Sequence, residues 1–483
     1  MVAAGVIIGL ATLLIEVKSV AAPSRGPYFA TGIKICEVDS TSAIIWTRLT
    51  RNPVRVGPEQ PMPIVHYRDP KTGTLTDNPR GRPDMEPVVE FPKGSNLDSI
   101  EGAVPGAPGE VRVRYRTAGG HWEATPWKAV DPNRDFTAHF RLEQLKPATA
   151  YEIEVESRSG QKLSGRFHTA PPPAQPARVV FTVITGTAYP DKDLPEGFKI
   201  YAHMRKLDPD FFVHTGDIVY YDRLAKTQAL ARWHWHRMYS LPTNVEFHRQ
   251  VASYFIKDDH DTWMNDCWPT MKTRFMGEFT FAQGQAIFLE QVGMSDRTYR
   301  TFRWGKDLQI WLPEGRDFRS PNTMPDGPDK TIWGKEQKEW FKRTVQSSDA
   351  TFRVLISPTP LVGPDRGNKG DNHANKAFTH EGNELRSFIA GQKNMYVVTG
   401  DRHWQYVSVD SKTGVMEFSC GPASDEHAGG YSMDQRRPEH RYLNIVGGFL
   451  AGTVERVNGK PELIFRHYSV DGKVLNEVRL PAR

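Results

Sequence analysis

The stretch DFFVHTGDIVYYD (residues 210–222) is an apolar run that breaks off at a glycine and an acid, Gly216 and Asp217. Other short apolar runs in the second half of the chain also break into polar loops, at 178–186, 253–261, 308–317, 352–360 and 394–403. Helix candidates lie between several of them, at 197–207, 230–239, 334–345 and 381–390. Strands that alternate with helices predict an α/β domain whose sheet is covered on both faces.

The polar residues of this domain gather where the predicted strands end, which is where open α/β sheets carry their sites. Three strand ends stand out: they hold Asp217 and Tyr220, Asp259 and His260, and Asp401 and His403. Carboxylates, imidazoles and a phenolate are ligands for hard or borderline divalent and trivalent metals. The acids packed into 258–261 would repel one another unless something neutralised them. Together these features predict a site for two or more metal ions.

The first half of the chain has a different pattern. Segments 42–49, 111–117, 136–142 and 150–170 alternate apolar and polar residues between Gly, Pro and Asp clusters. This pattern predicts an antiparallel β-sandwich of the immunoglobulin or fibronectin type over residues 23–170.

Proline marks the predicted boundaries. Residues 53–108 are rich in proline, glycine and charge, and we expect them to form long excursions from the sandwich. PPPAQPA (171–177) predicts a stiff linker, because successive prolines prevent both helix and sheet hydrogen bonding. The α/β domain is then expected at 178–483.

Composition excludes several classes of protein. The formal charge is +5 over 483 residues, and basic residues are interspersed with acids, so nothing indicates nucleic-acid binding. The three cysteines, Cys36, Cys267 and Cys420, form no CxxC pair and predict neither a disulfide framework nor a zinc ribbon.

The N-terminus carries a short apolar run from Gly5 to Ile15, followed by Glu16. The run is too short for a stable membrane anchor. Val20 and Ala22 fit the small-residue pattern of a signal-peptide cleavage site, so residues 1–22 predict export to a secreted, periplasmic or cell-surface location. A buried N-terminal segment is the alternative. No transmembrane segment is expected in the mature chain.

The strand-end motifs carry a resemblance to a known superfamily. Their order, GD, then DDHD, then GDRH, resembles the metallophosphatases. Segments 216–222, 299–319, 333–345 and 399–403 resemble PhoD-type alkaline phosphatases in particular, and 30–49 is similar to the N-terminal sandwich of that family. The resemblance implies an αββα catalytic domain and hydrolysis of phosphate monoesters or diesters.

The resemblance also implies roles for individual residues. Asp217 would bridge two metals, Tyr220 and Asp259 would each bind one of them, and Asp401 and His403 would complete the shell. Outside the shell, His260 would contact the substrate phosphate and protonate the leaving oxygen, and Asp261 would orient its imidazole.

One departure from the family concerns the metals. The family supplies a cysteine ligand after the first catalytic strand, where this chain has Thr187 and Ala188. Iron and calcium are the metals that the resemblance implies, but manganese, zinc or magnesium are alternatives because Ala188 has no ligand atom. Thr185, Thr187 or water is an alternative occupant of the vacant position, and Cys267 is a weaker one.

Several other polar residues have two interpretations. Arg316 and Arg319 suit a pair of phosphate oxygens, but ordinary salt bridges fit them equally. His373, with Asp371 in the same loop, is a candidate for metal or substrate binding, and the alternative is a capping loop. Asp258 is expected to be structural. Histidines within predicted strands and helices, His214, His234 and His236, are also expected to be structural.

The sequence leaves three functions open. The first is a secreted metal-dependent phosphoesterase. The second is a hydrolase of the same fold with another substrate, which the missing cysteine makes plausible. The third is a non-catalytic surface protein that retains a structural metal. Retention of His260 and Asp261 beside the predicted ligands favours an enzyme, because a structural metal needs no such histidine. Purple acid phosphatases are the second family considered, but their later motifs carry paired histidines where this chain has Asp401.

Overall fold

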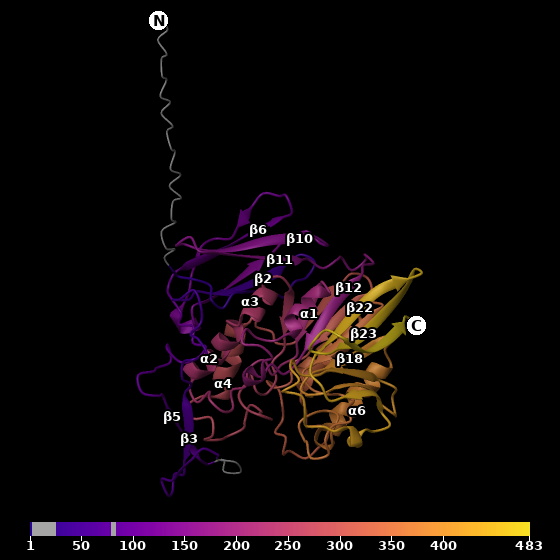
Figure 1. Cartoon of the computed structure of the whole chain (residues 1–483). Coiled ribbons are helices and arrows are strands. Elements are labelled where there is room, and N and C mark those ends of the chain that lie inside the picture. The colour runs from indigo at the N-terminus through magenta and orange to yellow at the C-terminus, as the bar shows by residue number, and fades with distance from the viewer. Residues whose placement is uncertain (2–25, 79–83) are drawn as a thin grey trace.

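The computed structural model describes residues 26–78 and 84–483 together with Met1, and Figure 1 shows their arrangement. The predicted signal peptide therefore lies outside the described residues, apart from Met1. Within the described ranges, no helix is long and apolar enough to cross a membrane.

Two large mixed sheets form the centre of the molecule. The nine-stranded sheet has the order β24 (Val474–Pro481), β23 (Lys460–Tyr468), β22 (Phe449–Val457), β12 (Val179–Ile184), β13 (Phe211–His214), β14 (Ala252–Phe255), β1 (Ile33–Cys36), β2 (Ala43–Arg48) and β9 (Thr137–Leu142). The seven-stranded sheet has the order β15 (Arg300–Trp304), β16 (Leu308–Leu312), β17 (Phe352–Ser357), β18 (Met395–Thr399), β20 (Met416–Cys420), β19 (Gln405–Val409) and β21 (His440–Asn444). Strands β12 to β14 are parallel, as are β16, β17, β18 and β20.

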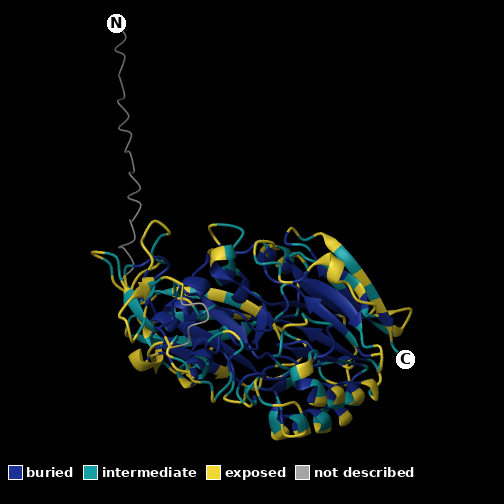
Figure 2. Cartoon of the chain, turned by 90° about the horizontal axis from the view of Figure 1, so that it is seen from below, coloured by how far each residue is buried: buried dark blue, intermediate teal, exposed yellow. Residues whose placement is uncertain are grey.

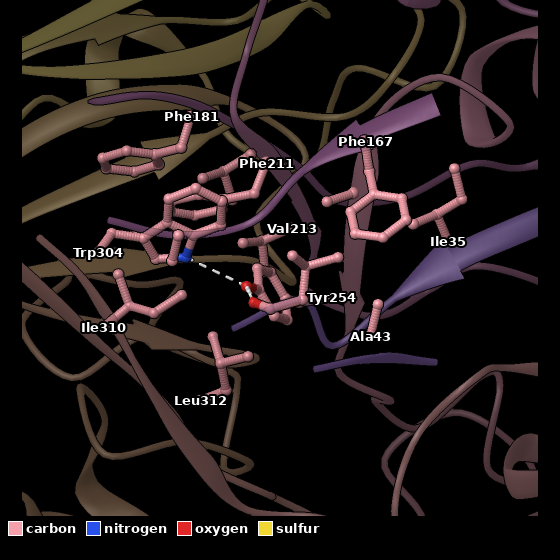
Figure 3. Packing of buried hydrophobic residues seen from close by; sticks show 14 of the residues in the cluster. Ile35, Ala43, Phe167, Phe181, Phe211, Val213, Tyr254, Trp304, Ile310 and Leu312 are labelled. Carbon is pink, nitrogen blue, oxygen red and sulfur yellow. Dashed lines mark hydrogen bonds between the residues drawn. The ribbon is translucent and has the colours of Figure 1, made fainter. Parts of the chain in front are cut away.

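Alternation along the strands builds three apolar layers. In β13, Phe211 and Val213 face the core between the two sheets, whereas Phe212 faces the helices outside. Figure 3 shows the inner layer, where Trp304 packs on Phe211 and donates a hydrogen bond to the Tyr254 hydroxyl at 3.1 Å. Successive strand side chains point to opposite faces, so a fully buried strand must be apolar on both.

Within the described residues, six α-helices cover the outer faces. The nine-stranded sheet packs against α1 (Ile200–Lys206), α2 (Gln228–Tyr239), α3 (Pro242–His248) and α4 (Phe281–Gln291). The seven-stranded sheet packs against α5 (Gly334–Gln346) and α6 (Thr379–Ala390). Figure 2 shows buried strands between helices that expose only one face. The four predicted helices are found, but α3 and α4 were not predicted. Short 3-10 turns, η1 to η4, lie at Pro132–Arg134, Tyr189–Asp191, Lys376–Phe378 and Met433–Gln435.

In the region predicted to be a β-sandwich, a separate sheet packs on one end of the nine-stranded sheet. This five-stranded sheet contains β11 (Lys162–His168), β10 (Ala150–Ser157), β6 (Glu110–Thr117), β7 (Glu123–Ala124) and β8 (Lys128–Ala129). Its partner strands β1, β2 and β9 continue the catalytic sheet, because Cys36 of β1 pairs in parallel with Ser253 of β14. The sandwich and the catalytic region thus share one sheet and one apolar core.

The expected excursion at 53–108 forms a small sheet of β4 (Leu75–Thr76), β3 (Ile64–Arg68) and β5 (Glu86–Glu90). It packs on α2, where Val65 and Val89 meet Leu230 and Trp233. Figure 1 shows β3 and β5 extending below α2, away from the sandwich strands. The excursion therefore brings residues of the first half of the chain to the catalytic half.

Candidate active site

The polar loops of both large sheets meet at the carboxyl ends of their parallel strands. Thr185, after β12, forms a parallel bridge with Pro422, after β20. The Thr185 hydroxyl also accepts a hydrogen bond from the backbone N–H of Asp401, after β18, at 3.1 Å. These contacts join the edges of the two sheets, so side chains from both reach one site.

Two Thr-Gly-Asp turns, at 215–217 and 399–401, allow the backbones to approach closely at this junction. Gly216 has φ +113°, and a Cβ there would lie 2.6 Å from the Asp258 Cβ and 2.7 Å from its backbone nitrogen. A Cβ on Gly400 would lie 2.2 Å from the Thr215 hydroxyl. Glycine is required where backbones approach this closely. Each glycine precedes an aspartate in the left-handed region, Asp217 at φ +56° and Asp401 at φ +60°.

The first group of side chains surrounds one oxygen of Asp217. Its Oδ2 atom lies 3.2 Å from the Tyr220 hydroxyl and 3.5 Å from Nε2 of His403. The Tyr220 hydroxyl also lies 2.6 Å from Nε2 of His427. Asp191 accepts a hydrogen bond from Nδ1 of His427 at 2.8 Å, which leaves Nε2 free to act as a ligand.

The second group lies on the other side of Asp217. Asp217, Asp259 and His260 bring ligand atoms within 4.8 Å of one another. Asp259 accepts a backbone hydrogen bond from Asp266 at 2.6 Å, which fixes one of its oxygens. Arg316 forms a 2.6 Å ion pair with Asp258 and lies 3.8 Å from Asp259.

His260 is oriented by a carboxylate. Its Nδ1 donates to Asp222 at 2.5 Å, and Asp222 also accepts the backbone N–H of Asn265 at 2.6 Å. Because Nδ1 is held in this way, Nε2 is the ring nitrogen available to a substrate.

Burial and neighbouring charges shift the pKa values of Asp217, Asp259 and His260. Burial, with the charge of Asp259 adding to it, raises the pKa of Asp217 to about 7, although His260 acts in the opposite direction. Burial alone would raise the pKa of Asp259, but Arg316 and His260 outweigh it and lower that pKa below its usual range. Burial would lower the pKa of His260, but Asp222 and Asp259 reverse this and raise it well above its usual value.

The donor set fits metal ions. Asp217 is almost fully buried, and its Oδ1 has no hydrogen-bond partner among the described residues. A buried carboxylate oxygen left unpaired is costly unless a cation neutralises it. Carboxylate, phenolate and imidazole donors from Asp217, Tyr220, Asp259, His403 and His427 suit hard or borderline ions.

Comparison with models of known protein families shows which family the chain belongs to. A family model described as PhoD-like phosphatase matches residues 181–447, which is more than half of the chain. The chain belongs to the PhoD-like phosphatase family. Alkaline phosphatase D of Bacillus subtilis (strain 168) is 22% identical over 532 aligned residues, covering 93% of this chain and 81% of that protein. The family function is phosphoester hydrolysis.

Two solved structures confirm the predicted fold class. The structure of PhoD has a TM-score of 0.70 at 16% identity and covers 95% of this chain and 90% of that chain. Purple acid phosphatase PPD1 from yellow lupin (Lupinus luteus) seeds has a TM-score of 0.63 at 11% identity, covering 93% of this chain and 74% of that chain. At these identities the likeness concerns the fold alone.

In this PhoD-like chain, no side chain of the turn after β12 replaces the cysteine ligand of the family. Ala188 has no ligand atom. Thr185 donates to the Gly216 carbonyl at 3.3 Å and Thr187 donates to the Ile218 carbonyl at 2.8 Å, so both hydroxyls hold the neighbouring turn. Cys267 is buried, its thiol donates to the Asp259 carbonyl at 3.6 Å, and burial raises its pKa to about 12.

The prediction that Asp261 orients His260 is wrong. Its carboxylate accepts the backbone N–H groups of Ile218 at 3.1 Å and Asp258 at 2.6 Å, so it ties the two strand-end turns together. Asp222 has the orienting contact instead. Residue 261 follows residue 260 directly, but the turn sends the two side chains in different directions.

The phosphate-binding interpretation of the two arginines is not supported. Arg316 is fully buried and pairs with Asp258, which gives that acid the structural role predicted for it. Arg319 is also buried, and it donates to the Asp371 carbonyl and lies over the Phe378 ring. Arg316 therefore fits the alternative of an ordinary salt bridge, whereas the hydrogen bond of Arg319 is to a backbone carbonyl.

The loop at 369–378 does not supply the metal group. His373 is buried, its Nε2 contacts Glu381 at 2.9 Å, and its ring packs on Trp333. Asp371 pairs with Arg402 at 3.4 Å and is not part of either group of side chains. The prediction that these residues bind metal is thus not supported. The carboxylate of Asp401 forms an ion pair with Arg402, and its role as a ligand stays a prediction.

Sequence reasoning missed His427 and the acids behind the two histidines, Asp191 and Asp222. His427 lies in SDEHAGG (424–430), several residues beyond the end of β20, so no apolar run ends at it. Asp222 is the last residue of the motif at 216–222, and no separate role was predicted for it. Among the histidines expected to be structural, His214 is buried and contacts Thr187 at 3.1 Å, and His236 contacts Asp135 at 2.5 Å.

Proposed function

We propose that this chain is an exported metal-dependent phosphoesterase that hydrolyses phosphate monoesters, diesters or both. The observation that carries the proposal is the convergence of ligand-type side chains on Asp217: Tyr220 and His403 lie beside its Oδ2 atom, Asp259 lies nearby, and its buried Oδ1 atom has no partner among the described residues. We propose that Asp217, Tyr220, His403 and His427 hold one ion, and that Asp217 and Asp259 hold a second. His427 would then provide, from the opposite sheet, the ligand that the family takes from its cysteine.

Two such ions, when bound, would supply Lewis-acid chemistry, lowering the pKa of water and stabilising charge on the phosphoryl oxygens. The protein's own groups do the rest. His260, held protonated by Asp222 and the neighbouring acids, is suited to donate the Nε2 proton to the leaving alkoxide oxygen. Arg316 and Asp261 hold the 258–261 turn in place.

The first experiment is hydrolysis of p-nitrophenyl phosphate and bis(p-nitrophenyl) phosphate by purified protein. Samples are stripped of metal and reloaded separately with iron, calcium, manganese, zinc and magnesium. We expect metal-dependent release that falls by a factor of at least about 1,000 in Asp217→Asn, because removing a charged metal ligand removes both ions' shared carboxylate. Bound metal per chain, measured by mass spectrometry, should fall in the same variant.

The matched control is Asp371→Asn, which alters a buried acid outside the metal group. Metal content and release that stay unchanged in Asp217→Asn would refute the proposal. No release with any metal, with metal still bound, would favour the non-catalytic alternative. The His260 and Asp222 pair argues for an enzyme, since a structural metal has no use for an oriented histidine beside its ligands.

Export rests on the sequence of residues 1–22 alone. A mature protein recovered outside the cytoplasm with its N-terminus near Pro23 would support export, and an intact Met1 on the mature protein would contradict it.

A further inference from the structure

A large cavity adjoins the metal group. It has a volume of about 540 Å³, and Tyr220 and His427 form part of its wall. Ala188 lies in the same wall, so the small residue at the cysteine position leaves no bulky side chain there. A phosphate bound at the metal group would have its organic group beside this cavity, because Tyr220 and His427 belong to both. The volume is in the range of pockets that hold small organic molecules.

The excursion from the first half of the chain builds the outer wall. Met62, Ile64 and Val65 line the cavity together with Leu224 and Met238 of the catalytic half. Ile64 and Met62 are 47% and 38% exposed, so part of their apolar surface is open to a ligand. The excursion packs on α2 through Val65, Leu230 and Trp233, and this packing holds the wall in position.

The carboxylates of the cavity wall are paired with histidines, and the remaining charged side chains of the wall are cationic. Both lining carboxylates already have histidine partners, Asp77 with His66 at 2.6 Å and Asp191 with His427 at 2.8 Å. Arg223 and Arg237 also line the cavity, and the Arg237 guanidinium lies over the ring of Trp233. The wall therefore offers apolar contact but no spare carboxylate for a cationic group.

We propose that this cavity binds the organic group of the substrate, and that the group is an apolar alkyl or aryl substituent on the scissile phosphate. This inference deepens the proposed function and depends on it. The expected gain in affinity follows from the area of apolar surface that the organic group buries in the cavity. Each CH₂ group that enters such a wall should increase affinity about two- to fourfold.

The test uses alkylphosphonates, which carry one organic group and cannot be hydrolysed. Inhibition constants are measured for methyl-, butyl-, hexyl- and octylphosphonate against p-nitrophenyl phosphate hydrolysis by the metal-loaded protein. We expect the constants to fall steadily from methyl to hexyl. The ratio of the methyl to the hexyl constant should fall at least fivefold in the double variant Met62→Asn, Ile64→Asn. Both residues are partly exposed, so the variant should fold.

The matched control is Val474→Asn, which changes a 45% exposed apolar residue at the far end of the nine-stranded sheet and should keep the wild-type ratio. Inhibition constants independent of chain length, with hydrolysis intact, would overturn the cavity assignment and leave the proposed function standing. Equal ratios in the double variant and wild type would also overturn it. Absence of both hydrolysis and methylphosphonate inhibition would overturn the proposed function itself.

Discussion

At the scale of single residues, the contact between Asp222 and His260 makes a prediction about catalysis. Replacing Asp222 with Asn should lower kcat about 10- to 100-fold, because the imidazole loses the carboxylate that orients it and keeps it protonated. Without that charge the pKa of His260 falls, so the proton donor is lost at a lower pH. The falling, alkaline limb of the kcat against pH profile should therefore move toward lower pH. Steady-state kinetics between pH 6 and 10 would measure both effects.

Asp261→Asn is the matched comparison, since it changes a neighbouring buried acid with a different contact. Its carboxylate binds two backbone N–H groups, and losing one of these hydrogen bonds should lower the free energy of unfolding by about 1–3 kcal/mol. The alkaline limb should stay where it is in the folded fraction. If Asp261→Asn moves that limb and Asp222→Asn does not, the two roles assigned here are reversed.

The site residues that could be predicted from sequence share one property: each ends an apolar run. Asp217, Asp259 and His403 were found because parallel strands bring their carboxyl ends to one edge. His427 comes from a loop that is long in sequence, and only the meeting of the two sheets places it beside Tyr220. Asp261 shows the opposite error, because adjacency in sequence does not fix the direction of a side chain in a turn.

At the scale of elements, the turn after β13 depends on Gly216. Gly216→Ala should lower the free energy of unfolding by about 2–4 kcal/mol, from a strained φ of +113° and a collision with the backbone of Asp258. Gly160 is the control, since its φ is +92° but a Cβ there would meet nothing within 4 Å. Gly160→Ala should cost only the backbone strain, about 1 kcal/mol. Urea unfolding of the two variants would compare them, and equal losses would exclude the collision.

Most catalytic strands and four helices could be predicted because their apolar patterns are local. The way in which the two halves of the chain are joined was harder to predict from sequence. The prolines at 171–177 indicate a linker, but the pairing of β1 with β14 joins residues more than two hundred positions apart, and no local pattern encodes it. Helix α4 lies in a segment for which no helix is predicted from apolar periodicity. Its start is set by a capping box of Thr280 and Gln283, which is a local signal in the sequence.

At the scale of the whole molecule, the shared sheet means that the sandwich supports the catalytic half directly. The core between the sheets runs without a break from Ile35 in β1 through Tyr254 in β14 to Ile310 in β16, and Figure 3 shows these residues together. The excursion adds a second connection, at the cavity wall. Removing the first half would expose β14 as an unpaired edge and open the cavity, so we infer that the chain functions as one unit.

The two layers of the fold also bury histidines in their neutral form, which makes stability depend on pH. Burial lowers the pKa of His467 to about 4 and of His214 to about 3, from an ordinary value near 6.5. The unfolded chain therefore binds more protons between pH 6.5 and 4, and stability falls as pH falls through that range. Each such histidine should remove roughly 2 kcal/mol of the free energy of unfolding between pH 7 and 5. His467→Gln keeps a donor for the Ser419 carbonyl, which now accepts from Nε2 at 3.0 Å, and should flatten this dependence. Urea unfolding from pH 5 to 8 would measure it, with the exposed His121→Gln as control. Parallel curves for His467→Gln and the wild type would show that His467 is not held neutral.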